Sequence, residues 1–213
     1  MPISRALDLS LYLVLDPDLC GGEAEMIRTA VEAAAGGASI IQLRTPSWKK
    51  RREAECARAL LQALRPLDVP LIIDDDADVA LAVQADGLHI GQDDLSPEDA
   101  RRLLGPDKII GLSVGSISEA EAVPRSLVDY VGIGPVYATQ TKKDACAALG
   151  LEALAHLRQL AALPAVAIGG IKASNASEVM ASGVDGIAVV SAICGQSDPQ
   201  ASARALRELV RSA

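Results

Sequence analysis

Eight short apolar segments, spaced on average about 25 residues apart, constrain the fold of this chain more than any other feature. They are continuous and rich in Val, Ile and Leu, as is typical of strands that are buried on both faces of a parallel sheet. The eight segments are Leu11–Leu15, Ile40–Leu43, Leu71–Ile73, Leu88–Ile90, Ile109–Leu112, Tyr130–Ile133, Val166–Ile168 and Ile187–Val190.

Amphipathic segments that predict helices lie between these strands: Ala24–Ala35, Trp48–Leu64, Pro97–Leu104, Ser118–Ser126, Leu151–Ala162, Ser174–Ser182 and Pro199–Arg211. Such alternation is typical of either a closed barrel or an open, doubly wound sheet. Eight units in 213 residues fit the lower end of barrel sizes, and no G-x-G-x-x-G motif follows the first strand. We therefore predict an α/β protein in which residues 1–213 form a single (β/α)8 TIM barrel domain.

The composition argues against several classes of partner. Lys and Arg number 20 and Asp and Glu 28, and the resulting net charge of −8 disfavours binding to nucleic acid or to an anionic membrane. No apolar run is long enough for a membrane span. The four cysteines are far apart and form no C-x-x-C pair, which favours reduced thiols over a disulfide framework or a zinc site. We expect a cytoplasmic protein.

The polar residues that follow the predicted strands are the best candidates for function. In a barrel of this type, functional groups come from the carboxyl ends of the strands and the loops behind them. The candidates at these positions are Gln42, Arg44, Asp74, Asp75, Asp94, Ser113, Thr139, Gln140, Thr141, Lys142, Gly170, Val190 and Ser191. Their concentration predicts a functional site at one end of the barrel.

Two of these loops have the character of a phosphate site. Gly169-Gly170 follows the seventh predicted strand and Val190-Ser191 closes the eighth, where barrels commonly bind phosphate through backbone N–H groups. The same glycines would also suit tight strand-to-helix turns that bind no ligand.

Charged candidates follow the second, third and fourth predicted strands. A further one, Lys142, lies in the loop before the seventh. Asp75 and Asp94 follow adjacent strands and could hold Mg²⁺, or could form a solvated acidic loop. Arg44 follows a buried strand and would bind an anion or form a structural ion pair. Lys142 lies in a long loop and would be a solvated charge, or would meet an anion if the loop closes. His89 lies within a strand and is interpreted as a hydrogen-bonded core residue.

Taken together, these residues resemble the thiamine phosphate synthase family over nearly the whole chain. The His-x-Gly-Gln-x-Asp and Gly-Pro-Val…Thr-x-Thr-Lys patterns are the specific ones, whereas the last two matching segments occur in many phosphate-binding barrels. The segments that carry the resemblance are Leu11–Val14, Gln42–Arg44, Gly87–Leu95, Gly132–Lys142, Val166–Ile171 and Gly186–Ser191.

This resemblance implies a transferase that joins hydroxymethylpyrimidine pyrophosphate to thiazole phosphate and releases pyrophosphate, with Mg²⁺. It implies a dissociative reaction, which needs cations around the leaving group and little nucleophilic machinery. By position, Asp75 and Asp94 would hold the metal. The pyrimidine substrate and its pyrophosphate would contact Gln42, Arg44, Asp74, Ser113 and Lys142, of which Arg44, Ser113 and Lys142 are the catalytic candidates. The thiazole phosphate would contact Thr139, Gln140, Thr141, Gly170, Val190 and Ser191.

Two positions depart from the family pattern. Pro46 stands where the family usually has a lysine, and Asp74 stands where it usually has an asparagine. Both changes would weaken pyrophosphate binding unless Asp74 binds metal or is protonated, or unless Lys49 or Lys50 supplies the missing charge. Two alternatives therefore stay open: a non-catalytic relative that binds thiazole phosphate or thiamine phosphate, and a synthase-like enzyme with an altered pyrimidine substrate. A homo-oligomer is compatible with these features, which leave the oligomeric state open.

Overall fold

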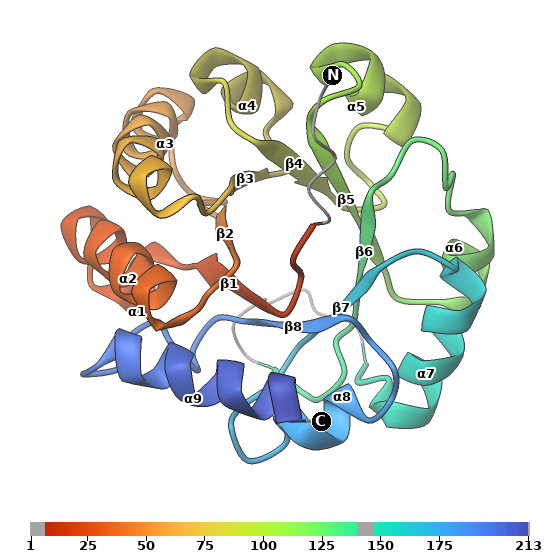
Figure 1. The fold of residues 1–213 in the computed structure, drawn as a ribbon. Coiled ribbons are helices and arrows are strands. Elements are labelled where there is room, and N and C mark those ends of the chain that lie inside the picture. The colour runs from red at the N-terminus through yellow and green to blue at the C-terminus, as the bar shows by residue number, and fades with distance from the viewer. Residues whose placement is uncertain (1–6, 140–146, 213) are drawn as a thin grey trace.

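Eight parallel strands close into a barrel in the computed structural model, which describes residues 7–139 and 147–212 (Figure 1). Neighbours in the chain are neighbours in the sheet, and the ring closes because the first strand pairs with the eighth. This confirms the predicted fold class. The strands are β1 (Leu11–Leu15), β2 (Ile40–Leu43), β3 (Leu71–Asp74), β4 (Gly87–Ile90), β5 (Ile109–Val114), β6 (Tyr130–Ile133), β7 (Ala165–Ile168) and β8 (Gly186–Val189).

Helices surround the barrel on its outer side (Figure 1). Among the described residues, none of them combines the length and the apolar character needed to cross a bilayer. They are α1 (Pro17–Cys20), α2 (Glu23–Gly36), α3 (Lys50–Leu64) with the 3-10 turn η1 (Arg65–Leu67), α4 (Ala77–Val83), α5 (Pro97–Leu104), α6 (Ile117–Ala122), α7 (Gly150–Ala161), α8 (Ala176–Met180) and α9 (Pro199–Ser212).

Several predicted boundaries were wrong for local reasons. The helix predicted to end at Ser126 stops at Ala122, because Val123 precedes Pro124 and adopts an extended conformation. The helix predicted over Ser174–Ser182 is confined to α8. Helix α4 was not predicted, since seven largely apolar residues give too short a stretch to show an amphipathic stripe. Strand β5 extends to Val114, so that Ser113 lies inside it, and Val190 lies just beyond β8.

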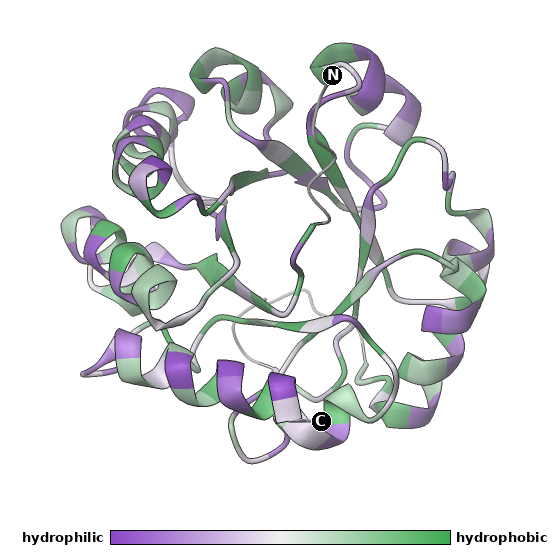
Figure 2. Ribbon diagram, viewed as in Figure 1, coloured by the Kyte–Doolittle hydropathy of each residue, from purple (hydrophilic) through white to green (hydrophobic). Residues whose placement is uncertain are grey.

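The strands separate two apolar layers, because successive side chains of a strand point to opposite faces. Leu11, Leu13 and Leu15 of β1 point outward into the large core beneath the helices. Tyr12 and Val14 of the same strand point inward and join Tyr130 in the smaller core that fills the barrel. The apolar strands and the apolar inner faces of the helices are visible in Figure 2.

The junction of the two chain ends needs close backbone contact. Gly36 of α2 lies against α9, where an added Cβ would come within 2.8 Å of the Ala203 Cβ. Arg207 of α9 donates to Asp8 at 2.8 Å. Although partial burial opposes the shift, hydrogen bonds from Arg207 and Ser10 lower the pKa of Asp8 to about 2. The first and last elements are thus held together by packing and by an ion pair.

One carboxylate is buried on the inner face of α3. Glu53 is 1% exposed, and its Oε2 atom makes no hydrogen bond to any described residue. Burial, which penalises the charged form, raises its pKa from 4.5 to about 7, and Asp78 and Asp75 add to this while Lys50 opposes it. The folded protein therefore holds the Glu53 proton more tightly than the unfolded chain does.

Replacing Glu53 by Gln is expected to stabilise the protein at high pH only. The unfolded carboxyl ionises near pH 4.5 and the folded one near pH 7, so the ionisation penalty grows between these values and is complete above them. Glu53→Gln should raise the free energy of unfolding by about 2–3 kcal/mol at about pH 8 and leave it unchanged at about pH 4. Urea unfolding of both proteins between about pH 4 and pH 8 measures this difference in the free energy of unfolding. The control is Glu55→Gln, at an exposed position of the same helix. A gain that does not depend on pH would contradict the assigned cause.

Candidate active site

The carboxyl ends of the eight strands and the loops that follow them form one rim of the barrel, called the mouth below. Because the strands follow one another around a closed ring of eight, β3 lies opposite β7, and β4 lies opposite β8 (Figure 1). The predicted metal ligands and the predicted phosphate loops therefore face each other across the mouth.

Arg44 and Asp74 form an ion pair at the end of β2 and β3. The Arg44 Nε atom lies 3.2 Å from the Asp74 Oδ2 atom, and the two side chains are only 21% and 13% exposed. Besides metal binding and protonation, the ion pair with Arg44 gives a further way to compensate the charge of Asp74. Arg44 thus forms the ion pair that was one of its two predicted roles, and its predicted contact with an anion stays a prediction.

Of the two lysines that could replace the cation absent at Pro46, Lys49 is exposed and Lys50 is paired. Lys50, at the start of α3, contacts Asp76, and its Nζ atom lies 3.5 Å from Asp78. Pro46 is exposed in the loop between β2 and α3. Lys50 therefore balances the acidic loop after β3 in the absence of substrate.

Asp75 has an unusual backbone conformation at the point where β3 ends. Its φ of +58° lies in the left-handed region, which Asp tolerates better than most residues. Its N–H donates to the carbonyl of His89 at 2.8 Å, which fixes the loop against β4. The side chain is exposed at the mouth. A non-glycine residue held in this region is often found at a functional site.

Asp94 closes the loop after β4. Its Oδ2 atom accepts the N–H of Gly91 at 2.8 Å, and Gln92 of the same loop donates from Nε2 to the Ser113 carbonyl at 2.6 Å. The loop is thus held above β5, with Asp94 exposed. Asp75 and Asp94 accordingly follow neighbouring strands, as predicted.

These carboxylates suit Mg²⁺ by their chemistry. Within residues 7–139 and 147–212 there is no group of three or more His, Cys, Asp or Glu side chains that would form a complete metal cage. Mg²⁺ seldom uses such a cage, since it commonly binds one or two carboxylates, waters and substrate phosphates. Two exposed carboxylates at an open mouth fit that mode of binding.

A hydrogen-bonded series of five side chains, called the interior chain below, runs through the barrel from β2 to β5. Gln42 Nε2 donates to the Tyr12 hydroxyl at 3.0 Å, which lies 2.8 Å from the Tyr130 hydroxyl. The Tyr130 hydroxyl lies 2.9 Å from His89 Nδ1, and His89 Nε2 lies 3.0 Å from Ser113 Oγ. The interpretation of His89 as a hydrogen-bonded core residue is confirmed.

Sequence reasoning missed Tyr12 and Tyr130, the two tyrosines of the interior chain. Burial in the barrel raises the pKa of Tyr12 and that of Tyr130, so both hydroxyls keep their protons at neutral pH. Their positions inside apolar strands gave the available signal, because a buried tyrosine hydroxyl needs a partner.

The glycine loop after β7 lies against the segment after β6. Gly169 and Gly170 have φ of +103° and +66°. A Cβ on Gly170 would come within 2.8 Å of the Tyr137 Cβ and 2.9 Å of the Ala138 carbonyl. Asn175 Nδ2 donates to the Gly170 carbonyl at 3.1 Å. Glycine is required here by backbone conformation and by close packing.

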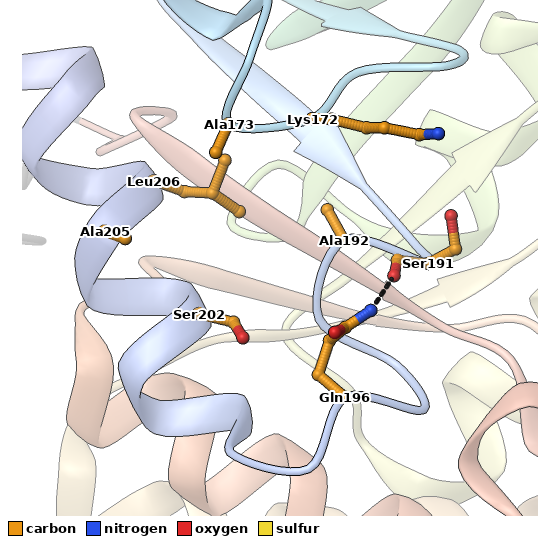
Figure 3. Close-up of a pocket in the computed structure, with 8 residues that line it drawn as sticks. All are labelled: Lys172, Ala173, Ser191, Ala192, Gln196, Ser202, Ala205 and Leu206. Carbon is orange, nitrogen blue, oxygen red and sulfur yellow. Dashed lines mark hydrogen bonds between the residues drawn. The ribbon is translucent and has the colours of Figure 1, made fainter.

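The loop after β8 borders a cavity of about 490 Å³ between the β7 and β8 loops and α9 (Figure 3). Ser191 lines it, and the Gln196 side chain donates to the Ser191 carbonyl at 2.9 Å. Lys172, on the loop after β7, lines the same cavity, and its side chain and that of Ser191 both extend to the right in Figure 3. This cation was not predicted, although it stands only two residues beyond Gly170.

The loop between β6 and α7 is described only in part. Thr139 is partly exposed just past β6, whereas Gln140, Thr141 and Lys142 lie outside the described residues. On the far side, Leu149 and Gly150 donate to the carbonyls of Pro135 and Val136 at 2.8 and 3.0 Å. Both described ends of the loop therefore lie at the mouth.

Comparison with known sequences gives one consistent result. The profile of the family described as thiamine monophosphate synthase matches residues 11–193. The thiamine-phosphate synthase of Laribacter hongkongensis is 52% identical over 207 residues, covering 97% of this chain and 98% of the relative. That of Azorhizobium caulinodans is 54% identical over 205 residues and covers 96% of each chain.

Comparison with solved structures agrees. The thiamine phosphate pyrophosphorylase of Pyrococcus furiosus superposes with a TM-score of 0.86 at 38% identity, covering 97% of this chain and 98% of that one. A 3-hexulose-6-phosphate synthase superposes with a TM-score of 0.71 at 19% identity, over 94% of this chain and 99% of that one. The second similarity concerns the fold alone.

Replacing Gly170 by Ala is expected to destabilise the protein more than the same change at Gly183. Both glycines have positive φ, which costs any L-residue about 1 kcal/mol, but nothing lies within 4 Å of a Cβ on Gly183. Gly170→Ala should cost a further 1–3 kcal/mol, roughly, because it presses on Tyr137 and Ala138. Urea unfolding of both variants measures the difference. Equal losses in the free energy of unfolding would contradict the predicted steric cost and show that the loop after β7 can accommodate the added methyl group.

Proposed function

The chain belongs to the thiamine monophosphate synthase family, and on this premise we propose that its mouth joins hydroxymethylpyrimidine pyrophosphate to thiazole phosphate. The resemblance drawn from the motifs is thereby confirmed, and the protein is a transferase. The products are thiamine phosphate and pyrophosphate.

The arrangement of two phosphate-binding arcs across one mouth carries the proposal. Arg44, Asp75 and Asp94 lie on the arc of β2 to β4, while Gly170 and Ser191 lie on the arc of β7 and β8. A reaction between a pyrophosphate ester and a phosphate ester needs two such arcs, so that the reacting ends of the two substrates meet between them.

The first arc would hold the pyrimidine substrate and its pyrophosphate. Asp75 and Asp94 would hold Mg²⁺, which when bound supplies positive charge next to the leaving pyrophosphate. Arg44 and Lys142 would contact the same oxygens. Gln42 and Ser113 would contact the pyrimidine ring, because each is the last residue but one of its strand.

The second arc would hold the thiazole phosphate. Backbone N–H groups around Gly170, Val190 and Ser191 suit a phosphate because the positive φ values of the glycine pair turn the backbone sharply there. Thr139, Gln140 and Thr141 would complete this arc. Lys172 adds a cation to it, since it lines the same cavity as Ser191.

In the proposed reaction the attacking group is the thiazole nitrogen, so the protein need not supply a nucleophile. The bond between the pyrimidine methylene carbon and the pyrophosphate oxygen breaks, and the electron pair leaves with pyrophosphate. The thiazole nitrogen then donates its lone pair to form the new C–N bond. Residues of this chain bind, orient and neutralise charge, which agrees with an arc of cations and carboxylates and no nucleophile in the proposed set.

The ion pairs at the mouth bear on the two departures from the family pattern. Asp74 is balanced by Arg44, and the acidic loop beyond it by Lys50. A pyrophosphate entering with its metal would compete with these carboxylates for the cations. The proposal extends to small-molecule substrates rather than nucleic acid or a membrane as partners, with the oligomeric state left open, and to the cytoplasm as the location. These parts rest on the net charge and the cysteine spacing.

Thiamine phosphate should form when the purified protein is incubated with both substrates and Mg²⁺, and EDTA should abolish its formation. Asp94→Asn should lower kcat/KM by about 100-fold or more, the scale on which loss of a charge-stabilising group acts. Asp93→Asn, an exposed neighbour of equal charge, is the control and should have little effect. Activity that survives in metal-free protein would contradict the metal assignment, and no product under any condition would contradict the function.

Restoring the usual family residues should strengthen binding of the pyrophosphate group of the pyrimidine substrate. Asp74→Asn releases Arg44 from its ion pair, and Pro46→Lys adds a cation to an exposed loop. Each change should lower KM for the pyrimidine substrate by about 10-fold, the scale of one charge-assisted contact. KM for thiazole phosphate should not change. If Asp74→Asn instead raises KM for the pyrimidine substrate, the ion pair orients Arg44 for catalysis.

A further inference from the structure

The orientation of the Gln42 amide, with its nitrogen toward Tyr12, gives the hydrogen bonds of the interior chain a direction. The amide nitrogen of Gln42 can only donate, so the Tyr12 hydroxyl accepts from it at 3.0 Å. The single proton of the Tyr12 hydroxyl then points to the Tyr130 hydroxyl at 2.8 Å. If Tyr12 did not donate to Tyr130, its proton would have no acceptor within the interior chain, and a fully buried donor without an acceptor is costly.

The direction continues to the mouth. Having accepted from Tyr12, the Tyr130 hydroxyl donates to His89 Nδ1 at 2.9 Å. That nitrogen must then be unprotonated, so the ring proton resides on Nε2 and points to Ser113 Oγ at 3.0 Å. The Ser113 oxygen accepts this bond, and its own proton is left to donate elsewhere. Ser113 is partly exposed, near the carboxyl end of β5.

The barrel makes room for this arrangement with two glycines. A Cβ on Gly111 would collide with the Tyr130 hydroxyl and would lie 2.5 Å from His89 Nδ1. A Cβ on Gly132 would lie 3.1 Å from the His89 ring. The histidine and tyrosine rings are therefore confined between backbones, with little freedom to exchange partners.

We infer that His89 is a positioning residue, held as its Nε2–H tautomer by Tyr12 and Tyr130, and that it turns the Ser113 hydroxyl into a hydrogen-bond donor for a ring nitrogen of the pyrimidine substrate. The ring nitrogens of a pyrimidine have lone pairs and only accept, so a serine fixed as a donor recognises them. The identity of the ring rests on the proposed function, whereas the tautomer rests on the interior chain alone.

The His89 tautomer can be measured without any substitution in the interior chain. The sequence has two histidines, so protein labelled with ¹⁵N-histidine gives two sets of ring signals, and His156→Asn assigns them. His89 should show an unprotonated Nδ1 and a protonated Nε2. The opposite tautomer would mean that the hydrogen bonds of the interior chain point the other way, with Ser113 donating to His89, and would overturn the inference.

Kinetics of Tyr130→Phe test the role of the tyrosine pair. This change removes one hydroxyl, keeps the ring, and should leave His89 as a mixture of tautomers. KM for the pyrimidine substrate should rise by about 10-fold while KM for thiazole phosphate stays constant. An unchanged His89 spectrum, or an equal rise in both KM values, would overturn the inference. His156→Asn is the control for a histidine outside the barrel.

Two substitutions at His89 separate positioning from packing. His89→Gln can accept from Tyr130 and donate to Ser113, whereas His89→Leu can do neither. Gln should restore most of the pyrimidine affinity that Leu loses, and equal loss in both variants would contradict the role. If wild-type protein shows the Nε2–H tautomer but forms no thiamine phosphate, the proposed function fails and the tautomer assignment stands.

Discussion

The pairing of β1 with β8 is the constraint on which the rest of the structure depends. Once that pair forms, all eight strands share one ring, and each carboxyl end has a fixed partner across the mouth. The contacts that permit it are small and specific: the missing side chain of Gly36 beneath α9 and the ion pair of Arg207 with Asp8. Asp75 and Gly170, nearly a hundred residues apart in the chain, face each other for this reason alone.

Charge at the mouth is balanced before any substrate arrives. Arg44 lies beside Asp74, and Lys50 lies beside Asp76. The ion pair of Lys50 with Asp76 remains in contact with water, and such pairs contribute little to stability, so Lys50 can exchange partners at low cost. These pairs keep Arg44 and Lys50 at the mouth, near the place where the proposed reaction develops negative charge on the leaving pyrophosphate.

The interior of the barrel serves the site as well as the fold. Inward positions of small barrels are usually filled by apolar side chains, yet here Gln42, Tyr12, Tyr130 and His89 share the space with Val14 and Ile72. Such a polar series is stable only when every member has a partner. In the proposed arrangement these hydrogen bonds also fix the Ser113 hydroxyl as a donor at the mouth, which connects packing in the core with recognition of the substrate.

Sequence alone determined the alternation of strands and helices, because burial on both faces of a parallel sheet leaves a continuous apolar run. It also placed Asp75, Asp94 and Gly170 correctly after their strands. It could not decide whether Arg44 would meet a ligand or Asp74, since that depends on the distance between two neighbouring strand ends. Nor could it reveal that Tyr12, Tyr130 and His89 meet inside the barrel. Hydrogen bonds between residues 118 and 41 positions apart leave no local pattern, and only the closed ring brings these side chains within 3 Å of each other.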